Sequence, residues 1–175
     1  LKTNLKVIRE TIENFSKLVP YSKDEKFEIK NLIIAVELLT RNDLYNNKIK
    51  LVKELPKDID IYLNLPFQSV MQKFNNLFIN AIKSLENTKT PTIKLNAYVN
   101  NDFLTIEIID NGLKIEDKNI EKIFDFGYST TGGSGIGLYH AKYLCELFKG
   151  KIEIKPFVDE YNKAFLVHLP IIIEE

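Results

Sequence analysis

The strongest constraint on the fold is an amphipathic segment at 67–86. Apolar residues recur there at intervals of three and four, which gives a helix one broad hydrophobic side: Phe67, Val70, Met71, Phe74, Leu77, Phe78, Ala81, Ile82 and Leu85. Pro66 precedes the segment, and proline suits a helix start because its missing N–H is not needed there. We therefore predict a long helix that buries this side against other elements.

The remaining sequence predicts further helices and strands around this helix. Apolar periodicity indicates helices at 1–19, 27–44 and 135–149, and a short one at 117–123. Alternating apolar residues indicate strands near 49–51, 59–65, 92–99, 103–110, 151–157 and 164–170. Asn100-Asn101-Asp102 fits a hairpin turn between two of these strands. This order predicts an α/β sandwich with mostly antiparallel strands.

The overall composition narrows the function classes. The 175 residues suffice for one domain and a short extra element. Lys+Arg and Asp+Glu both number 24, which gives no reason to expect nucleic acid or an anionic membrane surface as partner. The single cysteine, Cys145, excludes an internal disulfide, fits a reducing compartment and, with two distant histidines, makes a zinc site unexpected. The chain begins at Leu1 and not at Met, which indicates a piece of a longer protein.

The N-terminal segment has two readings that the sequence leaves open. Alternating steps of four and three form a short heptad seam from Leu1, Leu5, Ile8 and Ile12 to Phe15 and Val19. The seam fits either a helix packed on its own domain or the end of a dimerising hairpin. Pro20 and the polar run 22–26 indicate a linker. We therefore expect residues 1–20 to be separate from a main domain at 27–175, with both readings of the N-terminal segment open.

The polar side of the long helix is a candidate site. Asn76, Asn80 and Lys83 fall within about 60° of one another on a helical wheel. An asparagine oxygen can ligate Mg²⁺, and a lysine can bind phosphate. Taken alone, these residues also fit an ordinary solvated helix surface.

Two further motifs carry similar chemistry. Asp110 ends an apolar strand before the turn Asn111-Gly112, where it can accept a hydrogen bond from an exocyclic amine or simply shape the turn. The run 132–138 is rich in glycine and precedes a helix, so its N–H groups can surround an anion. It lacks the lysine of a P-loop and follows no strand, so neither that loop nor a dinucleotide-binding loop fits.

Together, four segments resemble the motifs of the GHKL superfamily, which includes histidine kinases, type II topoisomerases, mismatch-repair proteins and ATP-driven chaperones. The segment 74–83 (FNNLFINAIK) resembles its N box, and 110–112 (DNG) resembles the first glycine box. The segment 123–131 (IFDFGYSTT) looks like the F box, and 133–138 (GSGIGL) looks like the second glycine box. The resemblance covers about 27–170 and implies the two-layer Bergerat ATP-binding fold, with a mixed sheet under helices.

The resemblance also implies roles for individual residues, with ATP (or ADP) and Mg²⁺ as the cofactors. Asn80 resembles the Mg²⁺ ligand, Asn76 and Lys83 its phosphate-side neighbours, and Asp110 the adenine-binding aspartate. Residues 113–134 resemble the ATP lid. The remaining ATP-binding positions that it implies are Gly112, Ile115, Phe126, Ser129, Thr130, Thr131, Gly133, Ser134, Gly135, Ile136, Gly137 and Leu138.

Asn76 separates branches of the superfamily. The hydrolysing members carry a glutamate there as general base for water, and an amide is not a base at neutral pH. The resemblance therefore implies a cytoplasmic histidine kinase domain that transfers the γ-phosphoryl group to a histidine upstream of Leu1. It also implies that residues 1–20 end the dimerisation hairpin, with a homodimer through upstream helices. The implied partner is a response regulator, without nucleic acid or direct membrane contact. We expect His140 on a helix surface and His168 on a strand face, neither of them phosphorylated.

Some residues depart from the family pattern. Lys114 stands where the first glycine box has a second glycine, and it can restrict the lid or reach phosphate. A threonine common near the last strand is absent from Lys163-Ala164-Phe165, which puts a water-mediated adenine contact in question. Two alternatives therefore stay open at this point: a degenerate nucleotide-binding module, and a GHKL kinase that acts on protein serine.

Overall fold

The computed structural model describes residues 23–56, 60–129 and 134–172. In chain order the elements are β1 (Glu25–Glu28), α2 (Ile29–Asn46), β2 (Lys50–Glu54), β3 (Tyr62–Leu65), α3 (Phe67–Ser84), β4 (Thr92–Asn100), β5 (Phe103–Asp110), the 3₁₀ helix η1 (Asp117–Asn119), α4 (Gly137–Leu147), β6 (Lys151–Val158) and β7 (Tyr161–Pro170). The helix predicted at 1–19, and with it the hairpin assignment of residues 1–20, lies outside the described residues.

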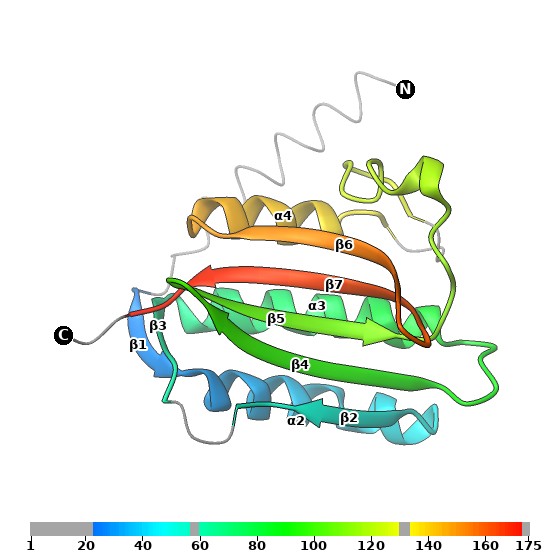
Figure 1. Cartoon of the computed structure of the whole chain (residues 1–175), viewed down its shortest axis with the longest axis horizontal. Helices are drawn as coiled ribbons and strands as arrows, with labels where there is room; N and C mark the ends of the chain where they lie inside the picture. The colour runs from blue at the N-terminus through cyan, green and yellow to red at the C-terminus, as the bar shows by residue number, and fades with distance from the viewer. Residues whose placement is uncertain (1–22, 57–59, 130–133, 173–175) are drawn as a thin grey trace.

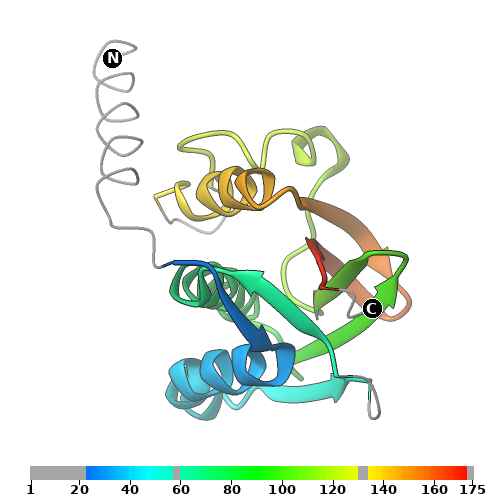
Figure 2. The ribbon, with the colours of Figure 1, turned by 90° about the vertical axis from the view of Figure 1, so that its left-hand side faces the viewer.

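One five-stranded sheet carries the domain, in the order β2-β4-β5-β7-β6. β2 runs parallel to β4, whereas the other neighbouring strands are antiparallel. β1 and β3 form a separate antiparallel pair. Figures 1 and 2 show α2, α3 and α4 on one face of the large sheet, with its other face open. The structure thus confirms the predicted two-layer sandwich with a mixed, mostly antiparallel sheet.

The helix predicted at 67–86 is α3, the middle helix of the layer, which contacts both α2 and α4. Its apolar side is buried as expected and packs into one large core with the sheet. Two polar residues, Lys73 and Ser84, are buried on the same helix. They are exceptions to the amphipathic pattern, and both have partners near the candidate site.

Several element boundaries differ from the predictions. Glu25 and Lys26 belong to β1 and not to a linker, and α2 begins only at Ile29. η1 is shorter than the helix predicted at 117–123. The left-handed residue after α4 is Lys149 (φ 58°), whereas Gly150 is constrained because a Cβ atom there would lie 2.2 Å from the carbonyl oxygen of His168.

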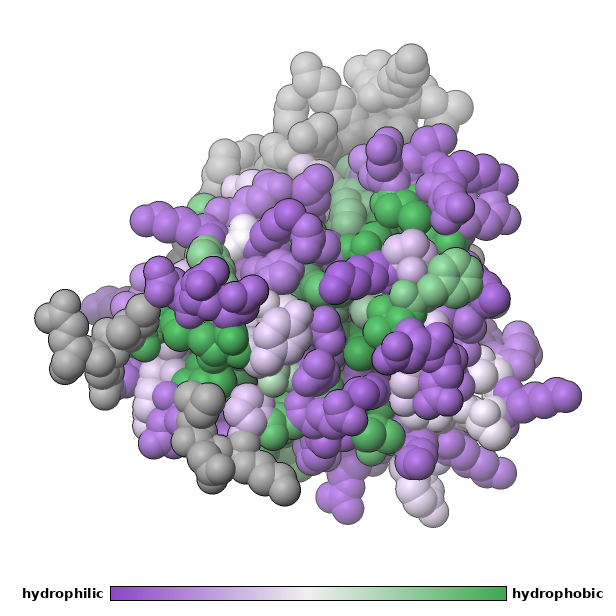
Figure 3. All heavy atoms as spheres, viewed as in Figure 1, coloured by the Kyte–Doolittle hydropathy of each residue, from purple (hydrophilic) through white to green (hydrophobic). Residues whose placement is uncertain are grey.

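The open face of the sheet is turned to the viewer in Figure 3, and it is mostly hydrophilic with scattered apolar patches. His168 lies on this face, where its Nδ1 is 2.9 Å from Thr105 Oγ1 and its Nε2 is 3.2 Å from Glu153 Oε2. This confirms its predicted place on a strand face. None of the described helices combines the length and hydrophobicity that crossing a membrane requires.

Candidate nucleotide site

A cavity of about 370 Å³ is lined by α3, the loop after β5 and the start of α4. Ten of the residues that the sequence analysis assigned to ATP line it: Asn76, Asn80, Lys83, Ile115, Ser129, Ser134, Gly135, Ile136, Gly137 and Leu138. Thr130, Thr131 and Gly133 lie outside the described residues. Segments that are distant in sequence, the N-box helix and the glycine loop, therefore meet around one cavity.

The polar side of α3 faces the start of α4 across this cavity. Asn76 and Asn80 are half-buried one turn apart, and Lys83 is exposed at the end of the row. A Cβ atom added to Gly137 would lie 4.0 Å from Asn80 Nδ2. Ile136, the N-cap residue of α4, has no polar side chain for capping, so the first N–H groups of the helix are available to an anion. Amides, an ammonium and a helix N-terminus together suit a polyphosphate.

A metal ion at this site would depend on few protein ligands. In the described part of the chain, no three His, Cys, Asp or Glu side chains gather as a metal-binding group. Asn80 lines the cavity, and its side-chain amide carries one oxygen that can act as a ligand. Mg²⁺ commonly takes one or two protein oxygens and completes its shell with phosphate and water, so this sparse donor set fits Mg²⁺ bound together with a polyphosphate.

Two glycines hold the ends of the loop over the cavity. Gly127 and Gly135 both have positive φ, 79° and 69°, and Gly127 N donates a hydrogen bond to Gly135 O at 3.1 Å. A Cβ atom at Gly135 would come within 2.3 Å of the Gly127 carbonyl carbon. The glycine at 135 is therefore required both by its backbone conformation and by the close approach of the two loop ends.

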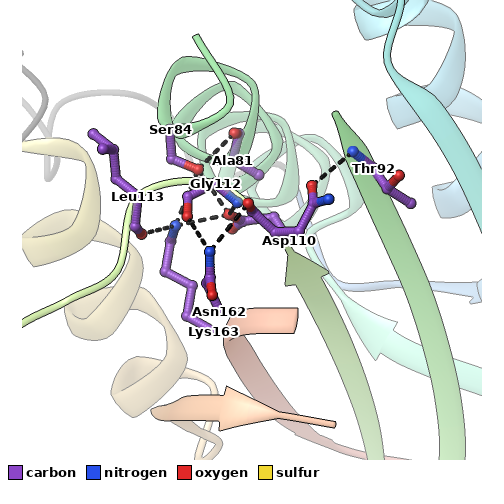
Figure 4. A network of polar contacts seen from close by, with 9 residues as sticks. Ala81, Ser84, Thr92, Asp110, Gly112, Leu113, Asn162 and Lys163 are labelled. Atoms are coloured by element: carbon purple, nitrogen blue, oxygen red, sulfur yellow. Dashed lines mark hydrogen bonds and ion pairs between the residues drawn. The ribbon is translucent and has the colours of Figure 1, made fainter. Parts of the chain in front are cut away.

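The turn after β5 is held by hydrogen bonds around Asp110 (Figure 4). Asp110 Oδ1 accepts a hydrogen bond from Gly112 N at 2.9 Å and lies 2.8 Å from Ser84 Oγ. Gly112 fits only without a side chain, since a Cβ atom would lie 2.4 Å from the Ser84 carbonyl oxygen. Asn162 Nδ2 donates to the Gly112 carbonyl oxygen at 2.6 Å. Gly112 therefore shapes the turn and is not part of the cavity lining.

Asp110 is not at the surface of the cavity, contrary to the expectation for an adenine-binding aspartate. Its side chain is 0% exposed, and Lys163 forms an ion pair with it at 2.7 Å between Nζ and Oδ1. Lys163 and Ser84 line the cavity in its place. The sequence showed only that a threonine was absent from the segment 163–165. The ion pair depends on the register of β5 and β7, which sets Asp110 opposite Lys163.

The other lining residues were not singled out individually as ATP-binding: Ile79, Ser84, Leu113, Ile123, Tyr128, His140, Lys163 and Phe165. Ile79 falls within the N-box segment, and Leu113, Ile123 and Tyr128 fall within the segment that resembles the ATP lid. The remaining four lie outside the four motifs, so no local signal marked them. Among them, His140 is half-buried and not on an open helix surface as expected. Its Nδ1 lies 2.7 Å from Nζ of the buried Lys73. Burial lowers the pKa of Lys73 to about 8, and burial together with the Lys73 charge lowers the pKa of His140 to about 4.

Lys114 and Phe126, which the sequence suggested as candidate contacts to the nucleotide, do not line the cavity. Lys114 Nζ lies 5.0 Å from the ring centroid of Phe157, near the end of β6. Lys114 therefore does not reach the cavity in this structure. Phe126 packs edge-on against Tyr139 at 5.3 Å between centroids, on a different surface from the cavity lining. Its place indicates a role in holding the loop against α4.

The fold is similar to the catalytic domains of histidine kinases. The catalytic domain of ThkA superposes with a TM-score of 0.74 at 22% identity, over 85% of this chain and 97% of that chain. Full-length ShkA, solved in complex with AMPPNP, gives a TM-score of 0.73 at 18% identity, over 85% of this chain and 31% of that chain.

Residues 67–172 match the family described as histidine kinase-, DNA gyrase B-, and HSP90-like ATPase, and the chain belongs to this family. Among its relatives, a probable C4-dicarboxylate sensor kinase of Halalkalibacterium halodurans is 33% identical over 54% of this chain. The sensor histidine kinase WalK of Bacillus subtilis is 28% identical over 59% of this chain. The chain spans only 18% of the length of each relative.

Proposed function

We propose that this chain is the ATP-binding catalytic part of a histidine kinase, and that it binds ATP with Mg²⁺ in the cavity between α3 and α4. The observation that carries the proposal is the meeting of Asn80, Lys83 and the uncapped start of α4 around one cavity. Asn80 serves as the Mg²⁺ ligand, and Lys83 and the helix N–H groups serve the phosphates. The base lies toward the end lined by Ser84, Leu113 and Lys163.

The site suits transfer to an external nucleophile. Asn76 lies one turn before Asn80, and its amide cannot take a proton from water at neutral pH. Catalysis then consists mainly of positioning the γ-phosphoryl group and stabilising its charge. Two relatives that each match more than half of this chain are named as a sensor kinase and a sensor histidine kinase. These names favour phosphoryl transfer to histidine over hydrolysis of ATP or transfer to serine.

The phosphate acceptor is a histidine of the longer protein, outside the described residues. His140 Nδ1 is occupied by Lys73, and His168 is held between Thr105 and Glu153. In the longer protein we expect a dimer through helices and a response regulator that takes the phosphoryl group. ThkA has been solved in complex with the response regulator TrrA, and its fold matches 96% of this chain with a TM-score of 0.72.

The metal assignment is tested by calorimetric ATP titration with Mg²⁺ and with EDTA. Asn80→Ala should lower the Mg²⁺-dependent ATP affinity at least tenfold, because the ligand that joins metal and protein is lost. Asn75→Ala is a matched control, since this neighbouring half-buried asparagine does not line the cavity. Unchanged affinity of the Asn80→Ala protein would contradict the assignment.

The kinase assignment is tested with radiolabelled ATP on a longer chain that includes the upstream helices. We expect label that is stable in base and lost in acid, as for phosphohistidine, and none on residues 1–175 alone. Acid-stable label would indicate phosphoserine, and ATP hydrolysis without labelled protein would indicate an ATPase.

A further inference from the structure

The core-facing residues of β5 and β7 are apolar except for one pair of opposite charges, Asp110 and Lys163. This pair lies at the end of the cavity proposed for the nucleobase, which Ser84, Leu113 and Lys163 line. Asp110 and Lys163 are directly opposed in the pairing of these strands. Both side chains are almost fully buried, beneath Ser84 at the end of α3. Lys163 lines the cavity and Asp110 does not. Figure 4 shows the Lys163 ammonium between the Leu113 carbonyl oxygen and the Asp110 side chain.

The ammonium of Lys163 has no hydrogen left for a ligand. A lysine carries three N–H donors. Nζ lies 2.7 Å from Asp110 Oδ1, 3.0 Å from Ser84 Oγ and 2.7 Å from the Leu113 carbonyl oxygen. All three N–H donors therefore have protein acceptors. A nucleobase at this end of the cavity finds no free donor on Lys163.

The carboxylate of Asp110 carries an acceptor that the protein leaves unused. Oδ1 is contacted by Gly112 N, Ser84 Oγ and Lys163 Nζ. Oδ2 is buried and finds no hydrogen-bond donor among the described residues. A buried charged acceptor without a donor is costly, so a ligand amine that reached Oδ2 would gain a strong hydrogen bond.

We propose that Lys163 is a specificity-determining residue: by covering Asp110, it prevents the base end of the cavity from recognising the exocyclic amine of adenine. The inference rests on the proposed nucleotide site. With the ion pair closed, a purine is held by contacts that do not depend on its substituents, chiefly with the apolar side chains of Leu113, Ile115 and Phe165. The protein then discriminates weakly between purine nucleoside triphosphates.

The first test needs no substitution. Dissociation constants are measured with Mg²⁺ for ATP, GTP and purine riboside triphosphate, which lacks a group at C6. We expect the three values to agree within fivefold. A loss of more than fivefold on removal of the amine would overturn the proposal, because it would show that Asp110 or an equivalent acceptor already recognises adenine.

The second test uses Lys163→Thr, which uncovers Asp110 and leaves room for water or a base. A charged hydrogen bond is worth enough to raise ATP affinity at least tenfold, with GTP affinity changing less than threefold. Lys155→Thr, at an exposed position on β6, is the matched control and should change neither. A folded Lys163→Thr protein with unchanged or weaker ATP affinity would overturn the proposal.

The outcomes separate this inference from the proposed function. Binding of all three nucleotides that depends on Asn80 and Mg²⁺, together with strong adenine selectivity, refutes the role of Lys163 and leaves the nucleotide site standing. Absence of nucleotide binding in both the wild-type and the Lys163→Thr protein refutes the site itself and the inference with it. Circular dichroism shows whether the Lys163→Thr protein is folded. If it is unfolded, the comparison of the three nucleotides on the wild-type protein alone tests the role of Lys163.

Discussion

Replacing the buried Lys73 by methionine should stabilise the protein at neutral pH. Lys73 is 5% exposed, among apolar side chains of α3, α4 and β7. Its Nζ contacts His140 Nδ1, and because an ammonium has no acceptor, it must donate to this nitrogen when charged. The other titratable group beside it is Cys145, whose pKa burial raises to about 12. In the folded protein neither His140, with a pKa of about 4, nor Cys145 titrates between pH 7 and 10. The thiol of the unfolded chain does titrate in this range, but it is present in both the wild type and the variant.

The expected size follows from the pKa of Lys73. Its fall from 10.5 to about 8 corresponds to about 3 kcal/mol, at about 1.4 kcal/mol per pH unit. Between these pH values the unfolded chain binds more protons, so the free energy of unfolding rises with pH and is lowest below pH 8. Methionine removes this penalty but leaves His140 without its donor, which costs about 1 to 2 kcal/mol. The net gain at pH 7 is about 1 to 2 kcal/mol.

Urea unfolding followed by circular dichroism at pH 7 and pH 10 measures this effect. The free energy of unfolding of Lys73→Met relative to wild type should be about 2 kcal/mol less favourable at pH 10 than at pH 7, because the amine of the folded wild type has lost its charge at pH 10. Lys50→Met, at an exposed position on β2, is the control and should show no such change. Equal destabilisation by Lys73→Met at both pH values would refute the argument that a buried charge is the cause.

Three further substitutions test the loops of the site. Gly135→Ala should destabilise the protein by more than about 1 kcal/mol and weaken ATP binding, since its φ is positive and the added carbon meets backbone; thermal unfolding and calorimetry measure both effects. Lys114→Ala should leave ATP affinity within twofold, because its ammonium lies over Phe157; a tenfold loss would place it at the phosphates. Asn162→Ala removes two hydrogen bonds to the turn at 111–112 and should cost about 1 to 3 kcal/mol in urea unfolding.

The elements with strong local patterns were predicted well from the sequence. α3 begins directly after Pro66, as predicted, and eight of the nine apolar residues that predicted it lie within the helix, with Leu85 as its C-cap. The hairpin of β4 and β5 turns at Asn101, whose φ of 52° suits asparagine. Many of the residues that line the cavity were also singled out from the sequence, since they are adjacent on one helix or follow each other in one loop; their roles toward ATP stay predictions.

The features that depend on distant pairing were not predictable in the same way. β1 has only four residues and is defined by its antiparallel pairing with β3, more than thirty positions later. The contact between Lys73 and His140 joins α3 to α4, and each residue alone reads as a surface residue. The covering of Asp110 by Lys163 likewise requires the register of two strands whose sequences do not reveal it.

The strand order has a consequence for how this domain can meet other proteins. β2 and β6 are the outer strands of the large sheet. β2 is short and carries exposed Lys50 and Lys53, and β6 carries exposed lysines and Pro156, which has no N–H to donate. Such edges resist the addition of a further strand. Under the proposed function, a partner protein is therefore expected to contact side chains of the helices and loops and not to add a strand to the sheet.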